Sequence, residues 1–210
     1  MSNKTIYLIR HGETEYNRKG IVQGSGIDSV LNEKGHSQAQ AFFDAYKHIV
    51  FEKVYTSQLQ RTHQSVNGFL EKGLKHEILP GLNEISWGVK EGKVPSDSEK
   101  AYYESIMKRW ANGETNLAIE GGESPEEVII RQKQALSIIL KNQSEKLILV
   151  AMHGRALRII LSHITETPLK DMDNFKHGNL CLYKLSYSYL TNKYTVLSKN
   201  DTSHLAKMVM

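Results

Sequence analysis

The stretch TIYLIRHG at residues 5–12 opens with a short apolar run and ends in an arginine, a histidine and a glycine. A second stretch, LILVAMHG at residues 147–154, has the same arrangement and ends in the same histidine–glycine pair. Short apolar runs bounded by polar residues are typical of strands that are buried on both faces of a parallel sheet. We therefore predict buried strands over 5–9 and 147–151, each followed by a polar turn.

The segments around these two strands alternate between strand and helix patterns. Asn32 and Ser124 are suitable N-caps for two of the helices, and Pro125 suits a first helical turn. The predicted helices span 33–48, 58–71, 124–143 and 156–164, and weaker strands span 53–56, 77–79, 180–185 and 194–199. This alternation predicts an α/β fold, a three-layer sandwich with a mainly parallel central sheet and helices on both faces.

Residues 89–122 do not fit this alternation. We expect a short helical insertion here, with a helix over 98–110. The 210 residues contain no internal repeat and no clear linker, and their number suits one domain. The prediction is therefore a single domain over 1–210 with a helical insertion at about 89–122.

The composition is that of a globular protein, with 40% hydrophobic and 24% charged residues. No apolar run is long enough to cross a membrane, and the charged start argues against a signal peptide. Cys181 is the single cysteine, which excludes an internal disulfide framework, and a cytoplasmic protein is expected. The net charge of +4 is spread along the chain, which argues against nucleic acid and suits a small anionic ligand. Oligomeric state stays open, with a homodimer as one alternative.

The two histidine–glycine pairs follow the two most apolar strands. Ligands of open α/β sheets bind beyond the carboxyl ends of the strands. If the two strands are neighbours in the sheet, His11 and His153 meet in one crevice at this edge. The strand pattern thus predicts the place of a site as well as a fold.

Further polar motifs follow one another along the chain. RHGET at residues 10–14 is followed by Asn17 and Gln23-Gly24, then by TSQLQRT at 56–62, LNEISWG at 82–88, GGES at 121–124 and MHG at 152–154. In this order the motifs resemble those of the histidine phosphatase superfamily, the group that includes the phosphoglycerate mutases. The resemblance spans roughly residues 5–158, and it implies an enzyme that transfers phosphoryl groups.

Phosphoryl transfer needs a nucleophile, compensation for charge on three oxygen atoms, and a proton for the leaving oxygen. His11 is the expected nucleophile, because a neutral imidazole can attack phosphorus directly and form a phosphohistidine. Arg10 and Arg61 can present planar forks of donors to phosphate oxygens. His153 and Asn17 add further donors, and these five residues form the core of the predicted site.

Glu84, within the LNEISWG motif, is the expected general acid. Protonated, it donates to the leaving oxygen, and ionised, it activates water for the second half of the reaction. The alternatives for this role are Glu13, Glu91 and Glu123. Gln23 and Gly24 are expected to line the phosphate mouth. The nine histidines show no metal-ligand spacing, and neither a metal nor another cofactor is expected.

Three features resemble the phosphatase branch rather than the mutases. The segment 89–122 is shorter than the mutase insertion, Gln23 stands where mutases carry threonine, and Arg155 stands where they carry asparagine. A shorter lid admits water, which hydrolyses a phosphohistidine. We therefore predict a metal-independent phosphomonoesterase acting on small phosphorylated metabolites. The alternatives are a 2,3-bisphosphoglycerate-dependent phosphoglycerate mutase and a non-catalytic phospholigand-binding protein. The sequence leaves the roles of Arg155, His177 and His204 open.

Overall fold

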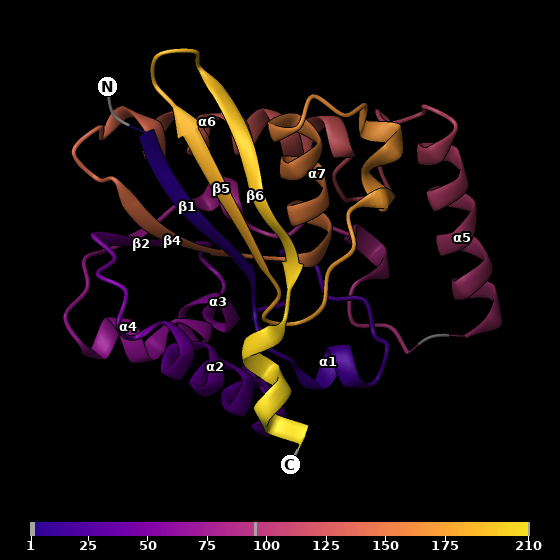
Figure 1. Cartoon of the computed structure of the whole chain (residues 1–210). Coiled ribbons are helices and arrows are strands. Elements are labelled where there is room, and N and C mark those ends of the chain that lie inside the picture. Colours follow the sequence, from indigo (N-terminus) through magenta and orange to yellow (C-terminus); the bar gives the residue numbers. More distant parts are fainter. Residues whose placement is uncertain (1–2, 95, 210) are drawn as a thin grey trace.

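A six-stranded sheet runs through the centre of the computed structural model, which describes residues 3–94 and 96–209 (Figure 1). The strands are β1 (Asn3–Arg10), β2 (Lys53–Thr56), β3 (His76–Ile78), β4 (Leu147–Met152), β5 (Leu182–Ser188) and β6 (Lys193–Asp201). Their spatial order is β3-β2-β4-β1-β5-β6. Strands β3, β2, β4 and β1 are parallel to one another, whereas β5 and β6 add an antiparallel edge. The predicted α/β fold with a mainly parallel sheet is confirmed.

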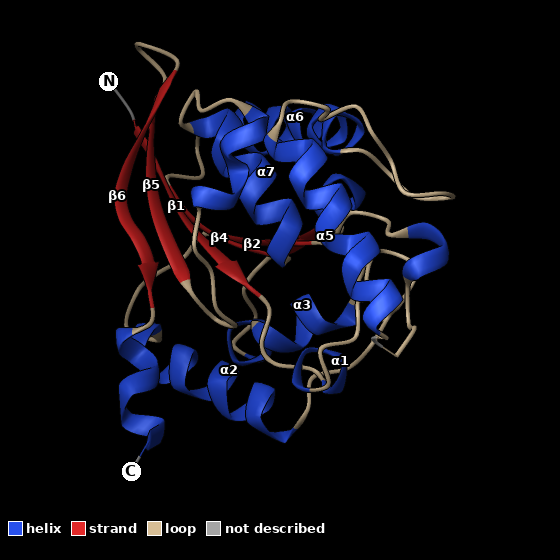
Figure 2. Ribbon diagram, turned by 90° about the vertical axis from the view of Figure 1, so that its right-hand side faces the viewer, coloured by secondary structure: helices blue, strands red, loops and turns tan. Residues whose placement is uncertain are grey.

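Helices cover both faces of this sheet, as Figure 2 shows with α6 and α7 above the strands and α2 below them. The α-helices are α1 (Glu15–Arg18), α2 (Glu33–Tyr46), α3 (Gln60–Ser65), α4 (Asn67–Glu71), α5 (Asp97–Ala111), α6 (Pro125–Lys141) and α7 (Gly154–Ile164). Four short 3-10 helices are η1 (Pro80–Leu82), η2 (Gly88–Lys90), η3 (Leu169–Asn174) and η4 (Ser203–Val209). No helix among the described residues is long and apolar enough to cross a membrane.

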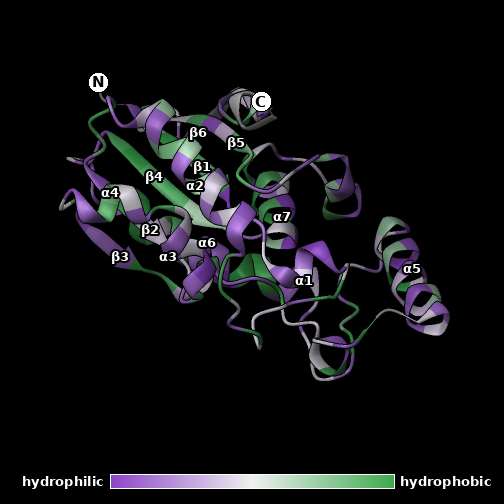
Figure 3. Ribbon diagram, turned by 90° about the horizontal axis from the view of Figure 1, so that it is seen from below, coloured by the Kyte–Doolittle hydropathy of each residue, from purple (hydrophilic) through white to green (hydrophobic). Residues whose placement is uncertain are grey.

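Alternate side chains of β1 divide the core between the two helical layers. Ile6 and Leu8 belong to the apolar cluster that α6 and α7 cover, whereas Tyr7 and Ile9 pack in the cluster that contains Phe42 of α2. Each of these five residues is at most 6% exposed. Burying one large apolar side chain stabilises a fold by about 1.5–3 kcal/mol. Strand β4, which is hydrophobic along its length in Figure 3, is likewise buried between the two layers.

Two of the predicted helix starts have the expected caps. The Asn32 side chain accepts a hydrogen bond from the backbone N–H of Gly35 at 2.8 Å. At the start of α6, Ser124 and Glu127 form a reciprocal capping box, and Pro125 occupies the first turn. These side chains satisfy backbone donors that have no partner within the helix, so both helices begin where the sequence predicts.

The helix predicted over 58–71 is wrong in its continuity, because the structure contains two short helices, α3 and α4. The break lies at Val66, whose ψ of 10° departs from helical geometry. The preceding Ser65 donates its hydroxyl to the carbonyl of Arg61 at 2.6 Å. A serine that bonds the carbonyl four residues earlier bends a helix. The same hydroxyl accepts the backbone N–H of Gly12 at 2.8 Å, so this bend ties α3 to the end of β1.

The fifth strand begins two residues later than predicted. Leu180 has a φ of +53°, a left-handed conformation that cannot continue into a strand. Its backbone N–H donates to the carbonyl of Arg10 at 3.1 Å. The chain therefore turns at Leu180 before β5 pairs with β1, and the residues just before this turn lie beside the carboxyl end of β1.

The segment 89–122 contains α5, which includes the predicted helix over 98–110. This helix stands at the right edge of the molecule in Figure 1, apart from the sheet. It contacts η3 and adds Trp110 to an apolar cluster with Trp87 and Ile159. Helix α5 thus forms a side wall beyond the carboxyl edge of the strands.

Candidate active site

The carboxyl ends of β1 and β4 lie side by side. These strands are parallel neighbours, and Arg10 stands opposite Met152 in the register. His11 and His153 directly follow these two strands, and the centroids of their rings are 5.2 Å apart. The two rings are neighbours at this edge of the sheet, as the sequence predicts for adjacent parallel strands, but only His11 lines the cavity.

The ring of His11 is fixed by the backbone next to it. Its Nδ1 lies 2.7 Å from the carbonyl oxygen of Gly12. Because a carbonyl only accepts, Nδ1 carries the proton and Nε2 keeps its lone pair. The turn is tight: a Cβ at Gly12 would lie 2.7 Å from the carbonyl oxygen of Gly35, so no side chain fits there. The sequence thus places an unprotonated ring nitrogen at the end of a rigid strand.

The environment of His11 keeps the ring neutral. His11 is 2% exposed and lines a cavity. Burial, followed by the positive charges of Arg61 and Arg10, holds the pKa of His11 well below its ordinary value of 6.5. Desolvation and neighbouring cations both disfavour the imidazolium form. At neutral pH the Nε2 lone pair is therefore available for reaction.

Arg10 lies beside His11 on the cavity wall. Its Nη1 lies 3.2 Å from Nδ1 of His177, which belongs to the loop before β5. Its Nε is buried and has no hydrogen-bond partner among the described residues. A buried donor of this kind is costly unless a ligand supplies the acceptor. Arg10 is therefore placed to bind an anion.

Arg61 and His153 form a layer behind the cavity. The Nε of Arg61 donates to Nδ1 of His153 at 3.1 Å, and its Nη1 and Nη2 donate to the carbonyls of Ile27 and Gly24 at 2.6 and 3.2 Å. Since Nδ1 of His153 accepts, its Nε2 carries the proton and donates to Oγ of Ser57 at 2.8 Å. Arg61 and His153 are 0% exposed, and neither of them, nor Gly24, lines the cavity.

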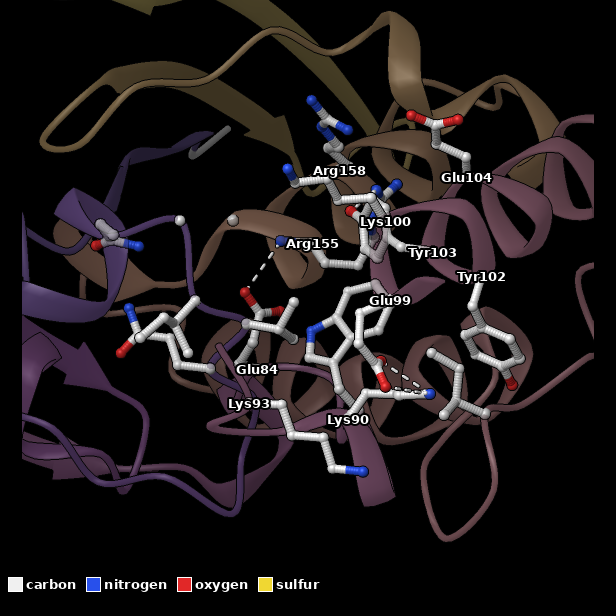
Figure 4. Close-up of a pocket in the computed structure, with 18 of the residues that line it drawn as sticks. Glu84, Lys90, Lys93, Glu99, Lys100, Tyr102, Tyr103, Glu104, Arg155 and Arg158 are labelled. Atoms are coloured by element: carbon white, nitrogen blue, oxygen red, sulfur yellow. Dashed lines mark hydrogen bonds and ion pairs between the residues drawn. The ribbon is translucent and has the colours of Figure 1, made fainter. Parts of the chain in front are cut away.

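Glu84 lines the same cavity, with its carboxylate directed at the backbone of Arg155 at the start of α7 (Figure 4). Its Oε1 accepts from the backbone N–H groups of Ile85 and Ala156 at 2.9 and 2.8 Å, and its Oε2 accepts from that of Arg155 at 3.1 Å. The positive end of a helix dipole attracts a carboxylate. The three donors fix the carboxyl group within the site.

Arg131 of α6 holds the loop that carries Glu84. Its guanidinium donates to the carbonyls of Gly81, Asn83 and Glu84 at 3.0, 2.9 and 3.0 Å. It also makes two hydrogen bonds, of 2.8 and 2.9 Å, to the carboxylate of Glu123. One side chain thus binds three carbonyl groups of the short segment 81–84, which ends at the candidate acid. No sequence pattern marks Arg131, because it stands within an ordinary amphipathic helix.

The alternative acids lie away from the cavity lining. Glu13 pairs with Lys34 at 2.9 Å, and Glu123 is bound by Arg131. Glu91 accepts the backbone N–H of Trp87 at 2.8 Å. Among these carboxyl groups, Glu84 alone reaches the cavity that His11 lines.

The mouth of the cavity beside α1 is built from amide and hydroxyl groups. Asn17 and Gln23 both line it. The Oδ1 of Asn17 accepts from Nδ2 of Asn179 at 3.2 Å, and Nε2 of Gln23 donates to Oγ1 of Thr14 at 2.7 Å. The Oε1 of Gln23 accepts from the hydroxyl of Ser29 at 2.6 Å. Asn17 and Gln23 thus line the cavity, and Asn179, in the loop before β5, contacts Asn17.

The cavity has a volume of about 430 Å³ and is rich in positive charge. Its charged lining consists of the cations Arg10, Lys90, Lys93, Lys100, Arg155 and Arg158 and the anions Glu84, Glu99 and Glu104. Several of these are already paired: Lys90 binds Glu99 at 2.8 Å (Figure 4), and Arg155 and Arg158 share Asp173. The excess of cations suits a ligand that carries negative charge.

The sequence left the roles of His177 and His204 open, and the structure shows where both residues lie. His177 lines the cavity, next to Arg10. His204 lies elsewhere: its Nε2 contacts the carbonyl of Leu180 at 2.9 Å, and its ring packs edge-on against Phe42. Among the described residues, no group of three or more His, Cys, Asp or Glu side chains is placed to hold a metal ion.

The comparisons with known proteins agree with this geometry. The sequence profile of the histidine phosphatase superfamily (branch 1) matches residues 6–202. The chain belongs to this superfamily, and the resemblance inferred from its motifs is confirmed. The family contains proteins named as phosphatases and as phosphoglycerate mutases.

Relatives of both kinds are similar over nearly the whole chain. A protein of Erwinia tasmaniensis named "Probable phosphoglycerate mutase GpmB" is 31% identical over 204 residues, which cover 95% of this chain and 94% of that protein. The alpha-ribazole phosphatase of Shigella flexneri has 24% identity and a TM-score of 0.82, covering 94% of this chain and 96% of its own. A mycobacterial glucosyl-3-phosphoglycerate phosphatase has 20% identity and a TM-score of 0.82, covering 95% and 100%.

Proposed function

We propose that the protein is a metal-independent phosphomonoesterase, a phosphoric monoester hydrolase that acts on small phosphorylated metabolites through a phosphohistidine. One observation carries the proposal. The ring of His11 donates from Nδ1 to Gly12, stays neutral, and keeps the lone pair of Nε2 free at a cation-rich cavity. A free lone pair beside donors for an anion is what attack on a phosphoryl group requires.

In the first half-reaction, Nε2 of His11 attacks phosphorus and a P–N bond forms. The bond between phosphorus and the ester oxygen breaks, and the carboxyl group of Glu84 supplies the proton that leaves with the alcohol. Nδ1–H of His11 stays bonded to the carbonyl of Gly12, which stabilises the positive charge that develops on the ring.

In the second half-reaction, the Glu84 carboxylate takes a proton from water as the water oxygen attacks phosphorus. The P–N bond breaks, inorganic phosphate leaves, and His11 returns to its neutral form. Arg10, Asn17 and Gln23 line the cavity and are proposed to bind the phosphoryl oxygens. Donors arranged in advance for such charge contribute about 100-fold or more each to the rate.

The phosphate contacts of Arg61, His153 and Gly24 stay predictions. For direct contact, Arg61 would have to turn its Nη groups away from the carbonyls of Ile27 and Gly24. From its present position its charge already favours the neutral form of His11. We propose that Arg61 and His153 serve catalysis from this second layer and bind phosphate when the substrate displaces those contacts.

A phosphoglycerate mutase is the second candidate, favoured by the name of the relative that is 31% identical. The two activities share the first half-reaction and differ in whether water or a second hydroxyl group takes the phosphoryl group. The neighbouring structures named as phosphatases, the short segment 89–122 and Arg155 in place of asparagine support hydrolysis. A cytoplasmic location and a homodimer accompany the proposal as expectations from the sequence.

The test is a phosphate-release screen over a panel of phosphorylated metabolites in the presence of EDTA. We expect release of phosphate from several substrates, an acid-labile phosphoenzyme, and loss of both in His11→Ala. The matched control is His36→Ala on the exposed side of α2.

Incubation with 3-phosphoglycerate and 2,3-bisphosphoglycerate distinguishes the second candidate, because a mutase yields 2-phosphoglycerate rather than free phosphate. Tight phosphoester binding without turnover would favour the non-catalytic alternative, and an active His11→Ala variant would contradict the phosphohistidine.

A further inference from the structure

The loop before β5 brings His177 against Arg10 at the cavity wall. Nη1 of Arg10 lies 3.2 Å from Nδ1 of His177. A guanidinium has donors and no acceptor, so Nδ1 of His177 must accept this hydrogen bond. The ring is therefore neutral, and its proton lies on Nε2. His177 thus offers one N–H donor that its partner Arg10 has fixed in place.

Nε of Arg10 and Nε2 of His177 both lie close to Gly154. A Cβ built on Gly154 would lie 3.4 Å from Nε of Arg10 and 3.4 Å from Nε2 of His177. Nε of Arg10 is buried and has no partner among the described residues. Arg10, Gly154 and His177 all line the cavity together with His11. Both nitrogens therefore lie beside Gly154 on the part of the wall that His11 shares, where an anion in the cavity can accept from both.

We propose that His177 is a catalytic residue, whose Nε2–H binds a phosphoryl oxygen of the substrate together with Nε–H of Arg10. The role of Arg10 and His177 in phosphoryl transfer rests on the proposed function of His11. Their binding of phosphate does not depend on that function. In the ground state and the transition state alike, these donors would hold an equatorial oxygen while the P–N bond forms.

The surroundings keep His177 in the form that this role needs. Burial, followed by the charges of Arg10, Arg158 and Arg155, lowers the pKa of His177 to about 3. No carboxylate stands among these causes, and all three charged neighbours are cations. Protonation would place an imidazolium against the guanidinium of Arg10, so the ring stays neutral at physiological pH.

His153 provides an internal contrast. Its Nδ1 also accepts from an arginine, Arg61, at 3.1 Å, which fixes the same tautomer. Its Nε2–H, however, is already bonded to Ser57 at 2.8 Å. The described hydrogen bonds leave Nε2 of His177 without such a partner, and His177 lines the cavity whereas His153 does not. Of the two, His177 is the histidine with a donor to offer.

Two variants distinguish the role of the Nε2–H donor of His177 from its role in positioning Arg10. His177→Phe keeps a ring but removes both nitrogens, and His177→Asn keeps an oxygen near the position of Nδ1 while it removes the Nε2 donor. Inorganic phosphate is titrated by calorimetry, and kcat and KM are measured with p-nitrophenyl phosphate. We expect phosphate binding to weaken about tenfold or more in both variants, and kcat/KM to fall about 100-fold. His163→Phe, at the far end of α7, is the control and should leave both unchanged.

Proton–nitrogen spectra of the histidine rings give a readout that does not depend on turnover. The His177 signal, assigned by its loss in His177→Phe, should show the proton on Nε2 and should shift when inorganic phosphate is added. Unchanged phosphate binding in both variants would overturn the proposal, as would a proton on Nδ1. A loss confined to His177→Phe would also overturn it, because it would reduce His177 to a support for Arg10.

The outcomes also separate this inference from the proposed function. If the wild-type protein hydrolyses no phosphoester but its phosphate affinity depends on His177, the proposed function fails and the anion-binding pair stands. If hydrolysis depends on His11 and both His177 variants retain wild-type phosphate affinity and kcat/KM, the proposed function stands and the role of His177 fails.

Discussion

The floor and the outer wall of the cavity are held by different kinds of interaction. The floor, defined here as Arg10, His11 and Glu84 with Arg61 and His153 behind them, is fixed mainly by backbone groups and by buried side chains. Glu84 accepts three backbone N–H groups, and His11 bonds a backbone carbonyl. These contacts follow from the sheet register and the start of α7, so they form whenever the fold forms.

In the outer wall, defined as Lys90, Lys93 and the cavity-facing residues of α5, side-chain contacts join Lys90 to α5. Lys90 binds Glu99 at 2.8 Å and lies over the ring of Tyr102, 4.3 Å from its centroid. Tyr102 is 36% exposed. The side chains of the Lys90–Glu99 pair are 20% and 28% exposed. Ion pairs that water still reaches contribute little to stability. The comparison teaches that the floor, which carries the reacting groups, is rigid, whereas the outer wall can change. Such a cavity can perform one reaction on different substrates.

The largest effect is expected on the floor, for Glu84→Gln. An amide cannot supply the proton to the leaving oxygen, so kcat for alkyl phosphates should fall about 100-fold to 10000-fold. With p-nitrophenyl phosphate, whose leaving group needs little protonation, the fall should be much smaller. Steady-state rates on both substrates measure this, and Glu104→Gln on the outer wall is the control. An equal loss of kcat/KM, which reports phosphoenzyme formation, on both substrates would contradict proton donation by Glu84.

The next effect tests how the floor is supported, by Arg131→Met. The loop of Glu84 loses a guanidinium that bonds three of its carbonyls, so we expect kcat for alkyl phosphates to fall about tenfold or more. Stability should also fall, by at least about 2 kcal/mol in urea unfolding, because buried carbonyls lose charged donors. Arg109→Met, at an exposed pair on α5, is the control. A stability loss with unchanged kcat on every substrate would show that the loop positions Glu84 without Arg131.

A third prediction concerns the pH dependence of stability. The pKa values of His11, His153 and His177 are all lowered in the folded protein, so the unfolded chain binds more protons than the folded one below pH 6.5. Stability should therefore be full above pH 6.5 and fall as the pH is lowered. Each such histidine contributes a slope of about 1.4 kcal/mol per pH unit in this window. Urea unfolding between pH 7.5 and 5 measures it.

A variant that lacks one of the three buried histidines gives the sharpest check of this pH dependence of stability. His177→Phe should show a shallower decline below pH 6.5 than the wild type. Glu13 and Glu127, whose pKa values are also lowered, lose their contribution only as the pH falls from about 4.5, so they do not enter the window. A slope that is unaltered in His177→Phe would mean that this ring titrates normally.

The smallest effect is expected on the outer wall, for Lys90→Ala. The variant removes the pair with Glu99 but touches nothing on the floor. We expect KM for a metabolite that reaches the wall to change about fivefold or less, with kcat for p-nitrophenyl phosphate unchanged. Glu99→Gln provides the matched variant from the other side of the pair. A fall in kcat on both substrates would break the separation between floor and wall.

The sequence predicted the fold class because strand patterns alternate with helix patterns along the chain, and because the apolar runs at 5–9 and 147–151 are typical of strands buried on both faces. It also predicted that His11 and His153 meet, since parallel neighbours end at one edge. The predicted helix over 58–71 failed at Val66, where the hydroxyl of Ser65 donates to the carbonyl of Arg61 and bends the helix. The same hydroxyl accepts from Gly12, a remote partner that no local pattern reveals. The predicted strand at 180–185 began too early because Leu180 turns to meet Arg10.

The sequence by itself determined the order of the motifs, the buried strands and the candidates Arg10, His11, Arg61, Glu84 and His153, because local pattern and residue chemistry carry that information. Only the tertiary structure decided which ring nitrogen keeps its lone pair, which donors remain unpaired and which carboxyl group reaches the cavity. Arg131 and His177 entered the site in the same way. The contacts of Arg131 and His177 join residues more than forty positions apart along the chain, and only the packing of the fold brings such residues together.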